Sequence, residues 1–407
     1  MMLNSHANNL SSKDKKDIFE LALFGGEPLF SKIKSTSNLF RPKESDFFKY
    51  AKTIFETRRL SNNGELVQLM ERRLCEIHQV NNCIAVCNGL WALVMTLKSI
   101  ALEGKSEVIM PSLTYRRMAD VTAWVKLTPN FCDVNKNTLG ISRQNVEPLI
   151  NNNTAAIIAA HPMVNLSDIT SLVELAKEKN IPLLFDSVEA AYASYNGKML
   201  GSFGRAEIYS MHASKFLNGF EAGYITTNDD DLAKNLRIMR GFGFNNPDNV
   251  EMLGLNAKLN ELHAAMALAS LDSIDSQIEK NKLRYLLYKS ELSKVKGLEL
   301  VNYDESEKRS YKTILIKLNQ DWGISRDDTI KLMHKENMLV RPYYCPPLHT
   351  KKTHYKVIFD SLPNTEIMKD EYILMPCGEF VSEDDIIKIV NFLNFVSDNS
   401  KEIKSKL

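Results

Sequence analysis

The sequence predicts an α/β protein, with a mostly parallel seven-stranded sheet flanked by helices and a smaller α+β region after it. Three observations carry this prediction. Short apolar runs alternate with stretches whose apolar residues recur at helical spacing, as in successive β-α-β units. Several runs are apolar throughout, which is typical of parallel strands buried on both faces. Near residue 275 the alternation gives way to a long helical stretch, which indicates a change of architecture.

Seven apolar runs predict the strands of the sheet. The first run leads through Asn88-Gly89, a turn signal, into a helical stretch. The fifth run ends in the carboxylate of Asp186. In chain order the runs are residues 83–87, 106–111, 128–134, 154–162, 181–186, 206–212 and 223–229.

The stretches between these runs predict helices, because their apolar residues recur three and four positions apart. Ser167 or Asp168 is the expected N-cap of the helix over 167–180. A single long helix is expected over 270–297, followed by a strand over 311–318. The other expected helices are residues 64–80, 90–104 and 114–127.

The change of texture divides the chain into three expected parts. Polar and broken sequence predicts an N-terminal arm over residues 1–42. The alternating elements predict a large domain over 43–275, and the remainder predicts a small C-terminal α+β domain over 276–407.

Composition excludes several classes of protein. The net charge is +1 with both signs interspersed, so neither a nucleic acid nor a membrane surface is an expected partner. No stretch approaches the ~20 apolar residues that span a bilayer, and the N-terminus lacks the apolar core of a signal peptide. The six scattered cysteines fit reduced thiols. Cys83 and Cys87 have no second Cys or His pair of matching spacing, so no metal site is expected. A cytoplasmic protein follows as the expectation.

Candidate functional residues collect at strand ends, where ligands of open α/β sheets bind. Backbone N–H groups after Asn88 suit a phosphate, although Asn-Gly is also an ordinary turn. Asp186 can pair with a cationic ring nitrogen or cap the next helix. Tyr115 can stack on a planar ligand or belong to the core. Ser210 lies near the end of the sixth run and Lys215 follows that run, and Lys215 taken alone is typical of a surface lysine.

Together these features describe a site for pyridoxal 5'-phosphate (PLP). A helix N-terminus and a hydroxyl hold the phosphate, a carboxylate keeps the ring nitrogen protonated, an aromatic ring covers the cofactor, and a lysine forms a Schiff base. This chemistry requires Lys215 to be partly desolvated, so that its pKa falls and the neutral amine is accessible.

The motifs also resemble, in order, those of the DegT/DnrJ/EryC1/StrS family of PLP-dependent sugar aminotransferases. This family has fold type I, the aspartate aminotransferase-like fold, and the resemblance runs from about residue 24 to about residue 390. It is carried by GGEPLF, RRLSNNGELVQLMERRL, VCNGLWAL, EVIMPSLTY, FDSVEAAYASYNGKMLGSFGRAEIYSMHASK, GLNAKLNELHAAMAL and VRPYYCPPLH.

The resemblance implies roles for the residues that hold the cofactor ring. Lys215 forms the Schiff base and moves the proton, and Asp186 pairs with the pyridine nitrogen. Glu189 stands where the family has Gln or Glu, near the ring hydroxyl and the substrate, and Tyr115 stacks on the ring.

It also implies a phosphate site and a homodimer. Gly89 and Leu90 offer backbone N–H groups to the phosphate, and Ser210 offers a hydroxyl. Asn256 and Lys258 lie on a segment that reaches the neighbouring subunit's site, because the family builds its active sites at a dimer interface.

The substrate is expected to be read by the residues around the cofactor. The stretch AAHPMVNLSDI replaces the family's usual segment near the substrate, which indicates an unusual substrate. Arg116 follows the stacking residue and can meet an anionic substrate or start a solvated helix. The expected substrate residues are Glu189, His161, Arg116, Tyr343, Tyr344 and His349.

The expected activity is transfer of an amino group from an amino acid, L-glutamate by resemblance, to a nucleotide-linked keto-sugar. A free or phosphorylated keto-sugar or a keto-octulosonate is an alternative acceptor. Family members that dehydrate sugars have His in place of the lysine, so Lys215 argues against a dehydratase. A non-catalytic PLP-binding regulator would usually carry a DNA-binding module, and no such basic module is visible.

Overall fold

The computed structural model describes residues 14–37 and 40–407. Its largest sheet has the strand order β17-β4-β3-β5-β6-β9-β10-β2, and every neighbouring pair is parallel except those made by β10. These strands are β2 (Asn82–Val86), β3 (Glu107–Pro111), β4 (Thr128–Cys132), β5 (Thr154–Ala160), β6 (Leu183–Asp186), β9 (Ala206–Ser210), β10 (Gly223–Thr227) and β17 (Ile358–Phe359). The seven predicted strands are confirmed, and β17 adds a short edge strand.

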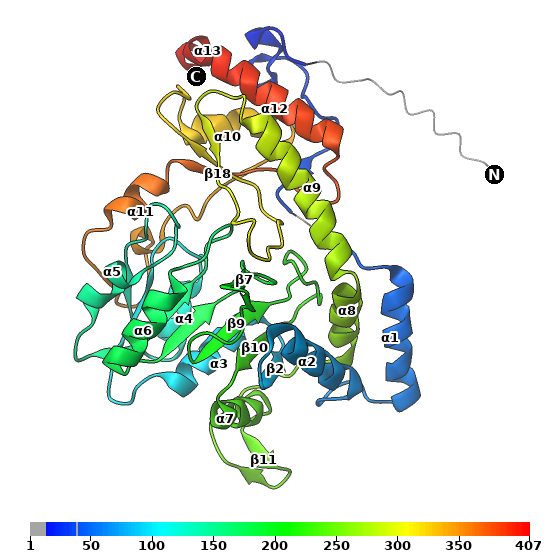
Figure 1. The fold of residues 1–407 in the computed structure, drawn as a ribbon, viewed down its shortest axis with the longest axis vertical. Helices are drawn as coiled ribbons and strands as arrows, with labels where there is room; N and C mark the ends of the chain where they lie inside the picture. Colours follow the sequence, from blue (N-terminus) through cyan, green and yellow to red (C-terminus); the bar gives the residue numbers. More distant parts are fainter. Residues whose placement is uncertain (1–13, 38–39) are drawn as a thin grey trace, which may run out of the picture.

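Helices cover both faces of this sheet (Figure 1). Alternate residues of a strand point to opposite faces, so Ile84 and Val86 pack with helices α3, α4 and α7, while Cys83 and Ala85 pack with α2 and α8. Helix α6 covers the second face near β5 and β6. The helices are α1 (Glu44–Thr57), α2 (Glu65–His78), α3 (Gly89–Ile100), α4 (Met118–Trp124), α5 (Arg143–Val146), α6 (Ile169–Lys179), α7 (Asp230–Arg240), α8 (Glu261–Asp272), α9 (Ile274–Leu292), α10 (Arg326–Lys335), α11 (Pro363–Met368), α12 (Glu383–Asp398) and α13 (Ser400–Lys406).

Two predicted helix boundaries are wrong for local reasons. Helix α4 starts at Met118 rather than near 114, because residues 114–117 form a turn in which the Met118 N–H donates to the Tyr115 carbonyl. The expected helix over 270–297 is broken at Ser273, whose backbone (φ −108°, ψ 5°) separates α8 from α9. The predicted N-cap of α6 is confirmed at Asp168, whose carboxylate accepts from the Ser171 N–H.

A second, antiparallel sheet lies beyond residue 275, with the order β13-β14-β18-β16. Its strands are β13 (Leu298–Leu300), β14 (Leu315–Leu318), β16 (Arg341–Pro342) and β18 (Tyr372–Leu374), so only the second half of the predicted strand over 311–318 is one. Helix α9 runs from beside the large sheet to α12 and α13 (Figure 1). Asp133 accepts from the backbone of Asn364 and Thr365 at 2.9 and 2.8 Å, which ties α11 to the large sheet. The division at residue 275 stays a prediction.

The N-terminal segment packs against the C-terminal part of the chain. Leu21 and Leu29 are buried, and the backbone N–H groups of Ala22 and Leu29 donate to Glu336 at 2.7 and 2.6 Å. Residues 1–13 and 38–39 of the predicted arm lie outside the described residues. The remaining short strands are β1 (Lys34–Ser35), β7 (Ser194–Tyr195), β8 (Lys198–Met199), β11 (Phe244–Asn246), β12 (Asn249–Val250) and β15 (Met338–Leu339). Among the described residues, none of the helices has the length and apolar character needed to cross a membrane.

Candidate active site

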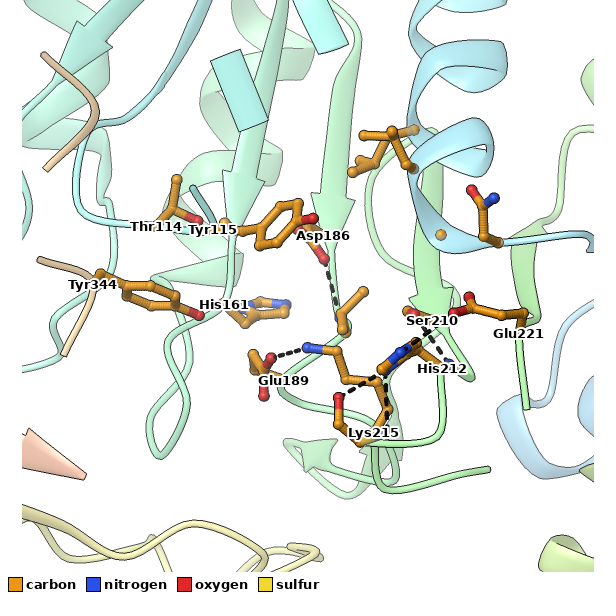
Figure 2. Close-up of a pocket in the computed structure, with 17 residues that line it drawn as sticks. Thr114, Tyr115, His161, Asp186, Glu189, Ser210, His212, Lys215, Glu221 and Tyr344 are labelled. Atoms are coloured by element: carbon orange, nitrogen blue, oxygen red, sulfur yellow. Dashed lines mark hydrogen bonds and ion pairs between the residues drawn. The ribbon is translucent and has the colours of Figure 1, made fainter. Parts of the chain in front are cut away.

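A pocket of about 440 Å³ opens at the carboxyl ends of the parallel strands. It receives side chains from the ends of β5, β6 and β9, from the start of α3, and from the turn before α4 (Figure 2). Among the predicted site residues, the pocket is lined by Gly89, Leu90, Tyr115, His161, Asp186, Glu189, Ser210, Lys215 and Tyr344.

The N-terminus of α3 packs closely against β9 and β10. The Asn88 carboxamide caps the helix by accepting from the Trp91 N–H at 2.9 Å. A Cβ on Gly89 would lie 2.8 Å from the Ser210 Cβ, and one on Gly223 would lie 2.6 Å from the Asn88 carbonyl carbon. Only glycines therefore allow this approach. The first turn leaves backbone N–H groups without intrahelical partners, which suits the phosphate of PLP.

Asp186 ends β6 and is buried. Burial raises its pKa from 3.8 to about 6, against the opposing effects of the Val188 N–H, which donates at 3.1 Å, and of the Lys215 ammonium. A buried carboxylate with too little positive charge around it fits a cationic ring nitrogen.

Lys215 and Glu189 form an ion pair on the other side of the pocket. The Lys215 Nζ lies 2.5 Å from the Glu189 Oε1. Burial lowers the pKa of Lys215, but the Glu189 and Asp186 carboxylates outweigh it, so the net pKa is raised. The expected fall in pKa is therefore wrong for the protein without cofactor. The Lys215 side chain lies near the carboxyl ends of the strands (Figure 2). It is mostly buried, as an amine that reacts with PLP must be.

His161 follows β5 and lines the pocket. Its Nδ1 accepts from the Ser167 N–H at 3.2 Å, which places the ring proton on Nε2. The Nε2 atom is buried and has no hydrogen-bond partner among the described residues. Burial, with a smaller effect of Arg309, lowers the pKa of His161 to about 3, so the ring is neutral. Its stacking on Phe185 (5.1 Å between centroids, 12°) fixes its orientation.

Five predicted residues do not line this pocket. Tyr343 is buried beside Tyr344, and Arg116 is exposed next to Tyr115. His349 bonds the Ser112 hydroxyl at 2.7 Å and Glu366 at 2.6 Å. Asn256 pairs with Gly241, and the Lys258 ammonium lies 4.1 Å from the centre of the Phe242 ring. The roles of Arg116, Tyr343, His349, Asn256 and Lys258 stay predictions.

Sequence reasoning missed two charged residues of the site. Lys312, before β14, reaches Glu189 with its Nζ 2.9 Å from Oε2. Glu221 lines the pocket and lies 3.3 Å from the His212 Nε2. Glu221 follows Lys215 by six residues, so its place beside this lysine could have marked it, whereas Lys312 belongs to no local motif.

The described residues thus fit PLP on three counts. They provide a closely packed helix N-terminus for the phosphate, a buried carboxylate whose pKa burial raises, and a lysine in the same pocket. They contain no group of three or more His, Cys, Asp or Glu residues that could hold a metal ion.

Comparisons with known proteins show which proteins this chain resembles. The model of the DegT/DnrJ/EryC1/StrS aminotransferase family matches residues 42–394. The GDP-perosamine synthase of Caulobacter vibrioides is 27% identical over 85% of this chain and 94% of its own. The dTDP-4-amino-4,6-dideoxy-D-glucose transaminase of Shigella dysenteriae is 24% identical over 86% and 95%. The crystal structure of DesI in the presence of its TDP-sugar product superposes with a TM-score of 0.91 at 28% identity, covering 96% of this chain and 99% of DesI.

Proposed function

Because this chain belongs to the DegT/DnrJ/EryC1/StrS aminotransferase family, we propose that it transfers an amino group to a keto-sugar linked to a nucleotide. The chain is a PLP-dependent sugar aminotransferase of amino-sugar biosynthesis. The observation that carries the proposal is the pocket in which Lys215, Asp186 and the start of α3 meet.

The residues of the pocket divide the work. Bound PLP supplies an aldehyde that reacts with amines and a ring that accepts electrons from the substrate. We assign Asp186 to the ring nitrogen, where a positive charge keeps the buried carboxylate ionised. Lys215 supplies the amine, which its burial favours in the neutral form and Glu189 favours in the charged form. The Nε2–H of His161 is left to donate to the cofactor or the substrate.

The nucleotide link is supported by positive charge next to Tyr115, which lines the pocket. Arg116 and Arg117 follow Tyr115, and the Lys351 Nζ donates to the Arg116 carbonyl at 3.1 Å. Burial and then these two guanidinium groups lower the pKa of Lys351, so positive charge is crowded here. Only Asp120, 3.1 Å from Arg117, is ion-paired with one of the three cations within the described residues. A diphosphate carries the complementary charge.

We also propose a homodimer, L-glutamate as the donor, and a cytoplasmic location. The six cysteines are all free, which fits a reducing compartment. The dimer is supported by apolar side chains exposed on one hairpin. The exposed side chains lie in or next to β11 and β12, and they are Phe242, Phe244, Val250 and Leu253. An isolated two-stranded hairpin has only marginal stability in water, so a partner that covers this one would stabilise it.

The test follows the two halves of the reaction. Purified protein should be yellow, and L-glutamate should change the absorbance of the bound cofactor and release 2-oxoglutarate. A nucleotide-linked keto-sugar should restore the first spectrum, and a free or phosphorylated keto-sugar should not. Lys215→Ala should lose the borohydride-reducible linkage. If no amino donor changed the spectrum, the chain would be a PLP-binding regulator instead.

A further inference from the structure

Glu189 is shared between two lysines. Its Oε1 lies 2.5 Å from the Lys215 Nζ, and its Oε2 lies 2.9 Å from the Lys312 Nζ. The side chains of Glu189 and Lys312 are only 12% and 10% exposed. Although burial raises the pKa of Glu189, the ammonium groups of Lys215 and Lys312 outweigh it and hold the pKa well below its usual range. A single buried carboxylate is therefore balanced by two cations.

The reaction with PLP places different demands on the protonation of Lys215 and Lys312. Lys215 lines the pocket and is the amine proposed to react with PLP, so it must give up its proton. Lys312 does not line the pocket and lies in the segment just before β14. Its backbone carbonyl accepts from the Cys377 thiol at 3.1 Å, which anchors its backbone. Of these two lysines, Lys312 is therefore the one that the reaction does not require to lose its proton.

We propose that Lys312 is the permanent counter-ion of Glu189, a positioning residue that keeps this carboxylate ionised and in place when Lys215 gives up its charge. This proposal rests on the proposed role of Lys215. Nothing in the sequence motifs marks Lys312, and it lies in the part of the chain that carries the second sheet.

A charge count explains why a second cation is needed. Asp186 and Glu189 carry two negative charges, and Lys215 and Lys312 carry two positive charges. When Lys215 becomes neutral, a buried Glu189 without Lys312 would bind a proton, because burial disfavours a lone charge. Glu189 would then cease to be a fixed acceptor beside the reacting amine.

Lys312 also weakens the hold of Glu189 on Lys215. If Lys215 were the sole partner of Glu189, the full charge of the carboxylate would stabilise the Lys215 ammonium. Here one carboxylate oxygen is paired with Lys312, so the stabilisation of Lys215 is smaller. Removal of the Lys312 charge should therefore stabilise the ammonium form of Lys215 and make its amine less available. Both effects predict poorer uptake of PLP.

The test is PLP uptake by the cofactor-free protein, followed by the absorbance of the bound cofactor. Lys312→Met, which keeps the volume and removes the charge, should weaken uptake by about 10- to 100-fold, the range of coupling between contacting charged residues. Lys312→Arg should remain within about 3-fold of the wild type, because it keeps the charge. In a Glu189→Gln background, Lys312→Met should have little further effect, because no carboxylate then needs a counter-ion.

The outcomes are separable. Equal weakening in both backgrounds, or no weakening by Lys312→Met, would overturn the proposal. If Lys312→Met alone does not fold, a folded double variant with Glu189→Gln supports the proposal, and an unfolded one overturns it. Failure of the wild type to take up PLP would instead overturn the proposed function on which this inference rests.

Discussion

At the scale of single residues, the pocket contains buried polar groups that are more stable with a ligand bound than without one. Asp186 is buried with a pKa of about 6, and His161 is buried with an Nε2 that finds no partner within residues 14–37 and 40–407. Both groups cost folding free energy when nothing binds them, since buried polar groups without partners are destabilising. Binding of a cationic ring nitrogen and a hydrogen-bond acceptor relieves that cost.

Replacement of Asp186 tests this cost directly. Its carboxyl group binds a proton more tightly in the folded than in the unfolded chain, with a pKa of about 6 against 3.8. The stability of the cofactor-free protein should therefore fall as pH rises through this window and stay lower above it, by about 3 kcal/mol. We expect Asp186→Asn to raise the urea midpoint of the cofactor-free protein at pH 8.

The advantage of Asp186→Asn should narrow as the pH approaches 4, where the wild-type carboxyl group is also neutral. Other buried groups, such as His161 and His78, titrate equally in both proteins and do not disturb the comparison. Saturating PLP should reverse the order, because only the carboxylate pairs with a protonated ring nitrogen. Equal midpoints at pH 8 without PLP would contradict the assigned role.

Arg116 tests the nucleotide link. Arg116→Gln should raise the KM for a nucleotide-linked keto-sugar by about 10-fold or more, the effect of losing a charge-assisted hydrogen bond. The glutamate half-reaction should be unchanged, since glutamate carries no diphosphate that Arg116 could bind. Arg72→Gln, on the exposed side of α2, is the matched control and should leave both half-reactions unchanged. An unchanged KM for Arg116→Gln would remove the support that this cluster gives to a diphosphate.

At the scale of elements, the site depends on how closely α3 approaches β9 and β10. Gly89 and Gly223 provide that approach, and each lies against a neighbouring backbone or strand side chain. The Asn88 cap fixes where the helix begins. The direction of the free N–H groups therefore follows from three residues on two elements.

Gly223→Ala should separate these elements. Its Cβ would lie 2.6 Å from the Asn88 carbonyl carbon and 2.7 Å from the Gly89 nitrogen, so backbone must move. We expect a loss of about 1–3 kcal/mol in the free energy of unfolding. We also expect PLP affinity, measured by absorbance titration, to fall about 10-fold because the phosphate site shifts. Gly241→Ala is the control, because its Cβ would meet nothing closer than 3.6 Å. Equal affinities in the two variants would contradict the importance of this contact.

The elements that sequence patterns predict well are those governed by local rules. The seven apolar runs became strands, and the Asp168 cap began α6, because alternation and capping act within a few residues. Lys215 and Asp186 were found because Asp186 ends a strand and Lys215 follows one. The contact of Lys312 with Glu189 and the helix break at Ser273 depend on tertiary packing, so no local sequence pattern predicts them.

At the scale of the whole molecule, segments far apart in the sequence pack together, whereas the hairpin of β11 and β12 exposes apolar side chains. The N-terminal segment packs on Glu336, and β17 returns to the edge of the large sheet. The hairpin of β11 and β12 instead extends away from α7 (Figure 1). Leu253, just after this hairpin, is 82% exposed, and a cavity of about 540 Å³ lies beside it between α3, α4 and α7.

Leu253 therefore provides the test of the homodimer. A second copy that covers the hairpin would bury Leu253, and a charge there would be stranded in an apolar interface. We expect Leu253→Glu to shift the protein from dimer to monomer in sedimentation experiments and to lower aminotransferase activity if the active sites are shared. Leu283→Glu, on an exposed turn of α9, serves as the control and should remain dimeric. A wild type that sediments as a monomer would contradict the dimer. A Leu253→Glu variant that remains dimeric would show that the copies meet through another face, because an unpaired carboxylate cannot be buried there without weakening the interface.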